Sequence, residues 1–96
     1  MEQPDIIIHQ PVRLKIMSAL KPLPPREQIE FVRLRKLIAA SEGNLSVHLQ
    51  TLEQAGYISI EKDFADNRPR TRIKLSAQGR RAYENYIGFF RELISE

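Results

Sequence analysis

The segment ADNRPRTR, residues 65–72, contains three arginines at alternate positions: Arg68, Arg70 and Arg72. A row of like charges repels itself, so it is typical of a surface that binds an oppositely charged partner. The proline and the Asp-Asn pair beside the arginines indicate that they lie near the tip of a turn. A solvated turn would contain the same residues, so the surrounding elements must decide between the two interpretations.

The positive charge of the chain is concentrated in its middle. The 96 residues carry a formal net charge of +3. Residues 1–30 and 76–96 hold equal numbers of basic and acidic side chains, whereas residues 31–75 hold eight basic and five acidic ones. A basic excess confined to one segment favours a polyanion as its partner.

Several classes of function lack the residues that they require. The chain has no cysteine, and its two histidines, His9 and His48, have no companions suited to a metal, so we expect no metal site. No hydrolase-like constellation and no glycine-rich phosphate loop are present, so we expect neither an enzyme nor a cofactor. The first residues form neither a signal peptide nor a membrane span, which makes the cytoplasm the expected location. His48 is expected to be a packed boundary residue.

Hydrophobic periodicity predicts three helices, over residues 9–21, 32–40 and 44–55. The turn 41–43, Ser-Glu-Gly, joins the second helix to the third, and Gly56 ends the third in the left-handed conformation. Two short helices joined by a short turn that contains glycine form a helix-turn-helix. A proline-rich loop, residues 22–28, separates the first two helices, and the sequence indicates no function for it.

Two alternating segments follow, residues 57–64 and 70–75, and the loop 65–69 between them predicts a β-hairpin. Ser76 then caps a long helix over residues 77–95. We therefore expect an α+β fold, mostly helical, in which three helices precede a hairpin and a long C-terminal helix. This is the order of a winged helix-turn-helix.

The segment GNLSVHLQTLEQAGYISIEKDFADNRPRTRIKLSAQGRRAYENYI, residues 43–87, resembles winged-helix transcriptional regulators of the MarR/ArsR-like superfamily, above all the small MarR-type proteins. The match extends to HQPVRLKIMSAL, residues 9–20. The resemblance implies a short strand at Ile29–Phe31 and a single DNA-binding domain over residues 1–96, with residues 76–96 as a dimerisation helix. It also implies a sequence-specific regulator that binds double-stranded DNA, with repression favoured over activation.

The third predicted helix has the character of a recognition helix. Leu45, Leu49 and Leu52 form one apolar stripe, and residues 44–52 contain no charged side chain. Such a helix can enter the major groove, where short polar side chains read base edges. A solvated face is the alternative, but it would usually carry charge. The side chains expected to contact bases are Asn44, Ser46, Val47, Gln50, Thr51 and Gln54.

The second predicted helix supplies further cations. We expect Leu34, Leu37 and Ile38 to point inward, which leaves the cations of this helix outward. The first helix of a helix-turn-helix crosses the DNA backbone, so outward cations there are suited to phosphate contacts. These residues are Arg33, Arg35 and Lys36.

The hairpin is the wing of the implied fold, and similar proteins use it to reach phosphates or the neighbouring minor groove. Arg70 and Arg72 share one strand face and are expected to follow one backbone. Arg68, at the turn, is the candidate for the minor groove, whose negative potential attracts guanidinium groups. Asp63 and Asp66 are expected to act as local partners that hold the arginines in place.

The last predicted helix has more apolar surface than a small core needs. Burial within the protomer accounts for part of it, and an isologous homodimer accounts for all of it. A two-fold dimer would bind an inverted-repeat operator, and an effector, if one exists, could bind at the dimer interface. The expected interface residues are Tyr83, Tyr86, Ile87, Phe89, Phe90, Leu93 and Ile94.

The alternative function is a winged-helix protein–protein interaction module that does not bind DNA. Such a module would be expected to have an apolar recognition-helix face and a neutral wing. The sequence has neither feature, which favours DNA binding.

Overall fold

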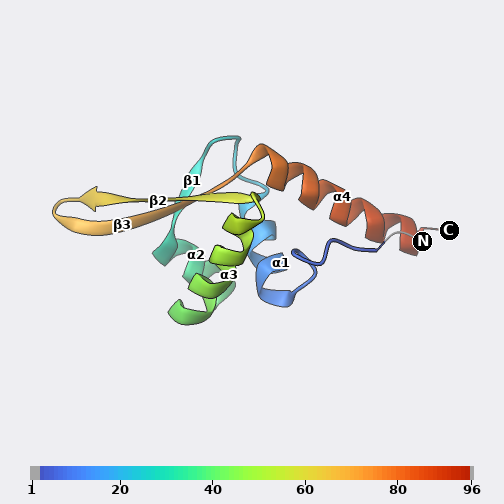
Figure 1. The fold of residues 1–96 in the computed structure, drawn as a ribbon, viewed down its shortest axis with the longest axis horizontal. Coiled ribbons are helices and arrows are strands. Elements are labelled where there is room, and N and C mark those ends of the chain that lie inside the picture. Colours follow the sequence, from blue (N-terminus) through green and yellow to red (C-terminus); the bar gives the residue numbers. More distant parts are fainter. Residues whose placement is uncertain (1–2, 96) are drawn as a thin grey trace.

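The computed structural model describes residues 3–95, and the ends of the expected domain over residues 1–96 lie outside this range. Helices α1, α2 and α3 form the body, the hairpin projects from one end of the molecule, and α4 projects toward the other (Figure 1). The longest dimension is 54 Å, against 25 and 21 Å for the other two. In chain order the elements are α1 (Pro11–Leu20), β1 (Gln28–Glu30), α2 (Phe31–Ile38), α3 (Glu42–Gln54), β2 (Ile58–Ala65), β3 (Arg68–Leu75) and α4 (Ala77–Ile94).

The helix-turn-helix consists of α2 and α3, with a link that differs from the predicted turn. Ala39 ends α2 in the left-handed conformation at φ 54°. The hydroxyl of Ser41 accepts the amide N–H of Asn44 at 3.1 Å and so caps α3. The prediction that Glu42 and Gly43 belong to the turn is wrong, because this serine cap starts the helix immediately before them. The predicted left-handed glycine after α3 is confirmed, at φ 81°.

The three strands form one antiparallel sheet in the order β1-β3-β2. The turn of the wing consists only of Asp66 and Asn67, which have positive φ angles of 52° and 63°, as a type I′ hairpin turn requires. The predicted loop over residues 65–69 is therefore too long, since Ala65 already pairs with Arg68. Strand β1 begins one residue before the strand implied by the resemblance.

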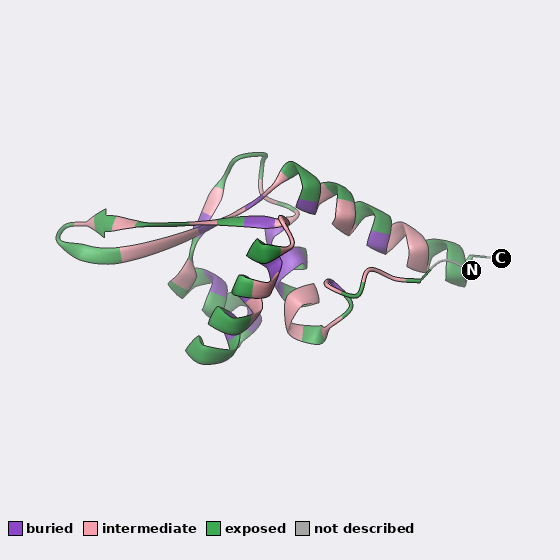
Figure 2. Cartoon of the chain, viewed as in Figure 1, coloured by how far each residue is buried: buried purple, intermediate pink, exposed green. Residues whose placement is uncertain are grey.

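Side chains from α1, α2, α3, the sheet and the segment before α1 form one hydrophobic core. Figure 2 shows how buried and exposed residues are distributed along the chain. The three leucines of α3 are buried, as predicted. In α2, Leu34 and Ile38 are buried, but Leu37 is 60% exposed, so the prediction that it points inward is wrong. Helix α2 has only eight residues, and its neighbours cover only the arc that holds Phe31, Leu34 and Ile38.

Helix α4 starts against the base of the wing. Ser76 caps it as predicted, since its hydroxyl accepts the N–H of Gly79 at 2.9 Å. A Cβ atom at Gly79 would lie 2.0 Å from the carbonyl oxygen of Tyr57, so only glycine fits there. Farther along, Tyr86 is 5% exposed, and its hydroxyl lies 2.9 Å from Nδ1 of His9. Tyr86 thus belongs to the core of the protomer, which corrects its expected place in a dimer interface.

None of the helices among residues 3–95 is both long and apolar enough to cross a membrane.

Candidate nucleic-acid interface

Helix α3 presents a polar surface on the side opposite its buried leucines. Ser46 and Gln50 lie on the flank that faces the wing. The helical periodicity places Asn44 and Thr51 on the other flank and Val47 between the two. Thr51 is half-buried, and its hydroxyl donates to the carbonyl oxygen of Val47 at 3.4 Å. The structure therefore brings the expected base-contacting residues onto one surface, where the other five are exposed: Asn44, Ser46, Val47, Gln50 and Gln54.

A groove of about 210 Å³ separates α3 from the wing. Glu42, Ser46 and Gln50 line it from α3, and Lys62 and Thr71 line it from the wing. Lys62 and Glu42 are charged residues of this groove that the sequence did not mark as site residues. The sequence does contain a pattern that indicates the position of Lys62. It stands two positions after Ile60, which faces the core, so the two side chains share one face of β2.

Arg70 and Arg72 are held by carboxylates of β2. Nε and Nη2 of Arg70 donate to the two oxygens of Asp63 at 3.0 and 2.9 Å. Nη2 of Arg72 donates to Asp63 at 2.7 Å and to Glu61 at 2.9 Å. The hydrogen bonds with Arg70 hold the pKa of the Asp63 carboxyl below its usual value. All four side chains lie on the sheet face opposite buried Ile73, so these guanidinium charges are compensated on the face turned away from the helices.

Arg68 differs from the other two arginines of the wing. It is the first residue of β3, next to the two-residue turn, and it is exposed. Within the described part of the chain it forms no ion pair. The expected role of Asp63 as a local partner of the arginines is confirmed, whereas Asp66 is a turn residue without such a pair among residues 3–95.

The three cations of α2 are all exposed, but they lie on different flanks. Arg33 lines a depression with Leu23, Glu27 and Leu37, on the side of α2 away from α3. The other flank of α2 begins with Phe31, which lines the groove between α3 and the wing. Arg35 and Lys36 follow one turn or more after Phe31, and the helical periodicity places Arg35 on the flank of the groove.

His48 connects α3 to α1. Nη1 of Arg13 lies 3.1 Å from Nδ1 of His48, and Nε of the same arginine donates to the carbonyl oxygen of Ile7 at 2.5 Å. Burial, and then the charge of Arg13, lower the pKa of His48, which favours the neutral ring. The prediction of a packed boundary residue is confirmed, and its contacts fix the flank of α3 that carries Asn44.

The second half of α4 carries an aromatic cluster that continues into exposed aliphatic residues. The ring of Phe90 stacks on His9 with centroids 5.9 Å apart, and Phe89 meets Phe90 edge to face at 5.1 Å. Beyond this cluster, Leu93 and Ile94 are 58% and 78% exposed. The apolar surface of α4 is thus partly used within the protomer, and its far end is open.

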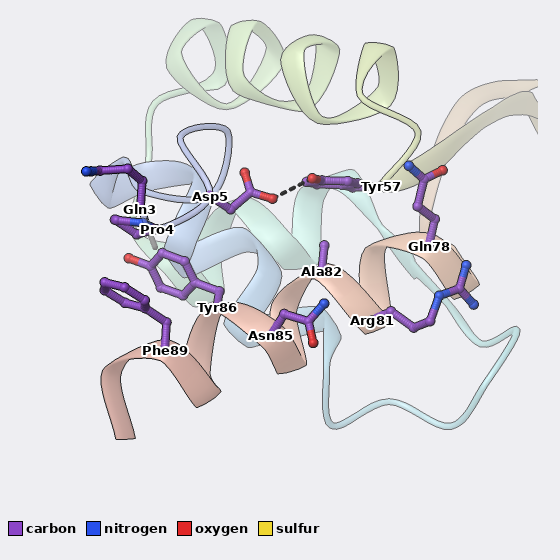
Figure 3. A pocket seen from close by; sticks show the side chains of 10 residues that line it. All are labelled: Gln3, Pro4, Asp5, Tyr57, Gln78, Arg81, Ala82, Asn85, Tyr86 and Phe89. Carbon is purple, nitrogen blue, oxygen red and sulfur yellow. Dashed lines mark hydrogen bonds between the residues drawn. The ribbon is translucent and has the colours of Figure 1, made fainter. Parts of the chain in front are cut away.

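A pocket of about 390 Å³ is lined by the segment before α1, by Tyr57 and by α4 (Figure 3). Asp5 accepts a hydrogen bond from the hydroxyl of Tyr57 and from the amides of Ile7 and Ile8. Burial and the hydrogen bond to Asp5 raise the pKa of Tyr57 to about 12. Asp5 therefore ties the N-terminal segment to the base of the wing.

Comparison with known proteins places the chain in a family. The model of the winged helix DNA-binding domain matches residues 12–94. An uncharacterized protein of Methanocaldococcus jannaschii is 37% identical over 81 residues, which cover 84% of this chain and 85% of that protein.

Two solved structures are similar to the whole arrangement. A transcriptional regulator homologue from Pyrococcus horikoshii superposes with a TM-score of 0.82 at 32% identity, over 92% of this chain and 84% of that one. A MarR-family transcriptional regulator from Silicibacter pomeroyi superposes with a TM-score of 0.71 at 20% identity, over 90% of this chain and 55% of that one, and shares the fold.

The chain belongs to the winged helix DNA-binding domain family. It is a DNA-binding transcriptional regulator, and the winged-helix fold that the sequence indicated is confirmed.

Proposed function

We propose that the protein binds a specific duplex sequence as a homodimer, with α3 in the major groove and the wing in the adjacent minor groove. The observation that carries this proposal is the groove between α3 and the wing, lined by Lys62, Thr71, Ser46 and Gln50. Adjacent major and minor grooves of DNA are separated by one phosphate backbone. A protein that occupies both must leave a passage for that backbone, and here the passage contains a lysine.

The base contacts in this proposal come from the exposed surface of α3. Gln50 and Asn44 have the amide groups that can bond adenine in a bidentate manner, and Val47 can contact a thymine methyl group. Glu42 is the first residue of α3. Its carboxylate only accepts hydrogen bonds, so it favours a cytosine amino group and repels phosphates. The mixture of amide, methyl and carboxylate groups suits a defined sequence better than any duplex.

The phosphate contacts in this proposal are the exposed cations near the groove. Lys62 lies in the groove, Arg35 borders it, and Lys36 and Arg68 extend the positive surface. Arg70 and Arg72 have carboxylate partners instead, so we assign them to stiffening the wing. Arg33 lies on the far flank of α2 and contributes at most a long-range charge. In this proposal Arg33, Arg70 and Arg72 are no longer backbone contacts and Lys62 is added, so the contacts are Arg35, Lys36, Lys62 and Arg68.

The homodimer in this proposal forms through the exposed end of α4. Leu93 and Ile94 are open there, next to the partly buried Tyr83, Ile87, Phe89 and Phe90. Two copies joined by this end would share a two-fold axis, and their wings would lie farthest from that axis, since the wing and the end of α4 are at opposite ends of the molecule (Figure 1). A two-fold protein fits an inverted repeat with half-sites about one helical turn apart.

Repression is the simplest regulatory outcome, because a dimer bound across a promoter excludes other proteins by its volume. If an effector exists, the pocket of Figure 3 is a candidate site, since it joins the N-terminal segment to α4 next to the proposed dimer interface.

Selection of bound duplexes from a random DNA pool by the purified protein tests the proposal. The expected product is an inverted repeat with two half-sites about one turn apart. Enrichment of no sequence, with binding that does not depend on salt, would favour the alternative of a protein–protein module.

A further inference from the structure

The outer part of the wing is a ribbon of two strands only. Strand β1 stops at the pair Glu30–Arg72, and β2 and β3 continue alone for four residue pairs up to the turn. The last pair that belongs to the core is Ile60–Ile73. Phe64 stands four positions beyond Ile60, which is about 14 Å at the rise of an antiparallel strand. This ribbon reaches well beyond the body of the protein (Figure 1).

Phe64 is a large apolar side chain that remains exposed in the folded protomer. It is 73% exposed, although it pairs with Pro69 across the ribbon. Side chains alternate between the two faces of a strand, so Phe64 shares a face with Lys62 and Ile60. Lys62 and Thr71 on that face line the groove toward α3. The phenyl ring therefore lies on the face of the wing that is turned toward the DNA in the proposed complex.

The surroundings of Phe64 indicate the chemistry of its partner. Apart from Ala65 next to it and Pro69 opposite it, its neighbours at the tip are polar or charged: Lys62 on the same face, and Asp66, Asn67 and Arg68 around the turn. A single ring set among polar groups is too small for a stable protein interface, which needs a contiguous apolar patch. The end of this narrow ribbon has one ring on one face and, on the other face, an arginine that forms no ion pair among residues 3–95. An aromatic ring together with an arginine is instead the combination with which minor-groove proteins separate a base step.

We propose that Phe64, supported by Pro69, inserts as a wedge into a base step of the minor groove at the outer side of each half-site, an inference that rests on the proposed DNA-binding function. Arg68 brings the tip to the negative potential of the groove, and Lys62 anchors the backbone beside it. The wedge kinks the duplex at two symmetric positions, one for each wing. It adds a preference for steps that unstack easily, namely pyrimidine–purine steps, at positions that no hydrogen bond reads.

The test uses the duplex recovered by selection, with 2-aminopurine placed at successive positions outside one half-site. The fluorescence of 2-aminopurine rises when its neighbour is unstacked. Wild-type protein is expected to raise it at one step only, and Phe64→Leu is expected to retain most of this signal. Phe64→Ala is expected to abolish the signal and to weaken binding of the dimer about a hundredfold, because each of its two stacked rings contributes about tenfold. Its salt dependence should be unchanged, because no charge is removed.

Leu37→Ala is the matched control, because Leu37 is also an exposed apolar residue but lies on the flank of α2 away from α3. It is expected to change neither signal nor affinity. The wedge is refuted if wild-type protein binds the duplex without any fluorescence change, or if Phe64→Ala retains the full change. In both cases DNA binding itself persists. Loss of all duplex binding by the wild-type protein would instead refute the proposed function.

Discussion

Removal of the lysine in the groove should weaken the electrostatic part of DNA binding, whereas removal of a lysine on the opposite sheet face should not. Lys62 lies in the groove between α3 and the wing. Lys74 is on β3 with the arginines, on the face turned away from the helices, and pairs with Ser59 and Gln28 in the ladder. Lys62→Gln and Lys74→Gln therefore make the same change of charge on the two faces of one sheet.

The size of the effect follows from counterion release. Each phosphate contact adds about 0.9 to the slope of log affinity against log salt, and a dimer loses two contacts when Lys62 is replaced. The slope should fall by about 1.8. A wild-type dimer that touches about 6–10 phosphates should lose a thousandfold or more in affinity when the salt rises fourfold, from about 50 to 200 mM. For Lys62→Gln this loss should be about tenfold smaller.

Fluorescence anisotropy with a labelled duplex over this salt range measures the slope. Lys74→Gln should leave it nearly unchanged, because its charge is far from the groove. An equal fall for both variants would refute the assignment of the two faces. A fall of about 0.9 for Lys62→Gln would mean that only one protomer contacts the DNA.

Three further predictions concern the interface, the specificity and the fold. Leu93→Asp combined with Ile94→Asp should give folded monomers in sedimentation experiments, because both residues are exposed in the protomer and two carboxylates would be buried in the dimer; a persistent dimer would exclude this end of α4. Gln50→Ala should cost about 1–3 kcal/mol for each half-site of the selected sequence and little on others; equal losses on all duplexes would contradict direct readout. Tyr57, whose pKa is raised from 10.0 to about 12, should stabilise the fold fully below pH 10 and lose this contribution as the pH rises to about 12; a free energy of unfolding that has the same pH dependence in Tyr57→Phe would rule this out.

The main elements of the fold could be predicted from the sequence because each is marked by local signals. The leucine stripe of α3, the glycine after it and the serine before α4 depend only on neighbouring residues. The predicted boundaries of helices and strands were wrong where two local sequence signals favoured different structures. Gly43 suggested a turn, but the hydroxyl of Ser41 caps α3 two residues earlier. Pro69 suggested a loop, but the ribbon beyond β1 tolerates a proline, because it pairs on one side only.

The parts of the site that could not be predicted depend on contacts across the fold. The pairing of Arg70 with Asp63 depends on the register of β2 and β3, and a different turn length would have placed other residues opposite each other. The burial of Tyr86 depends on His9, 77 positions away in the chain. The groove depends on how far α3 lies from the wing, which no local pattern contains.

Cleavage of DNA from tethered reagents tests the central arrangement most directly. The chain has no cysteine, so Gly43→Cys and Asn67→Cys each give one attachment site per protomer for an iron chelate, on α3 and at the wing tip. Gly43 is not one of the proposed base contacts, and a Cβ atom there would meet nothing within 4 Å. On the selected duplex, the chelate on α3 should cut within each half-site. The chelate on the wing should cut about half a helical turn, or about five base pairs, farther from the centre of the repeat, in both halves. Cuts from the wing that coincide with those from α3, or that fall between the half-sites, would contradict the proposed dimer and its placement on DNA.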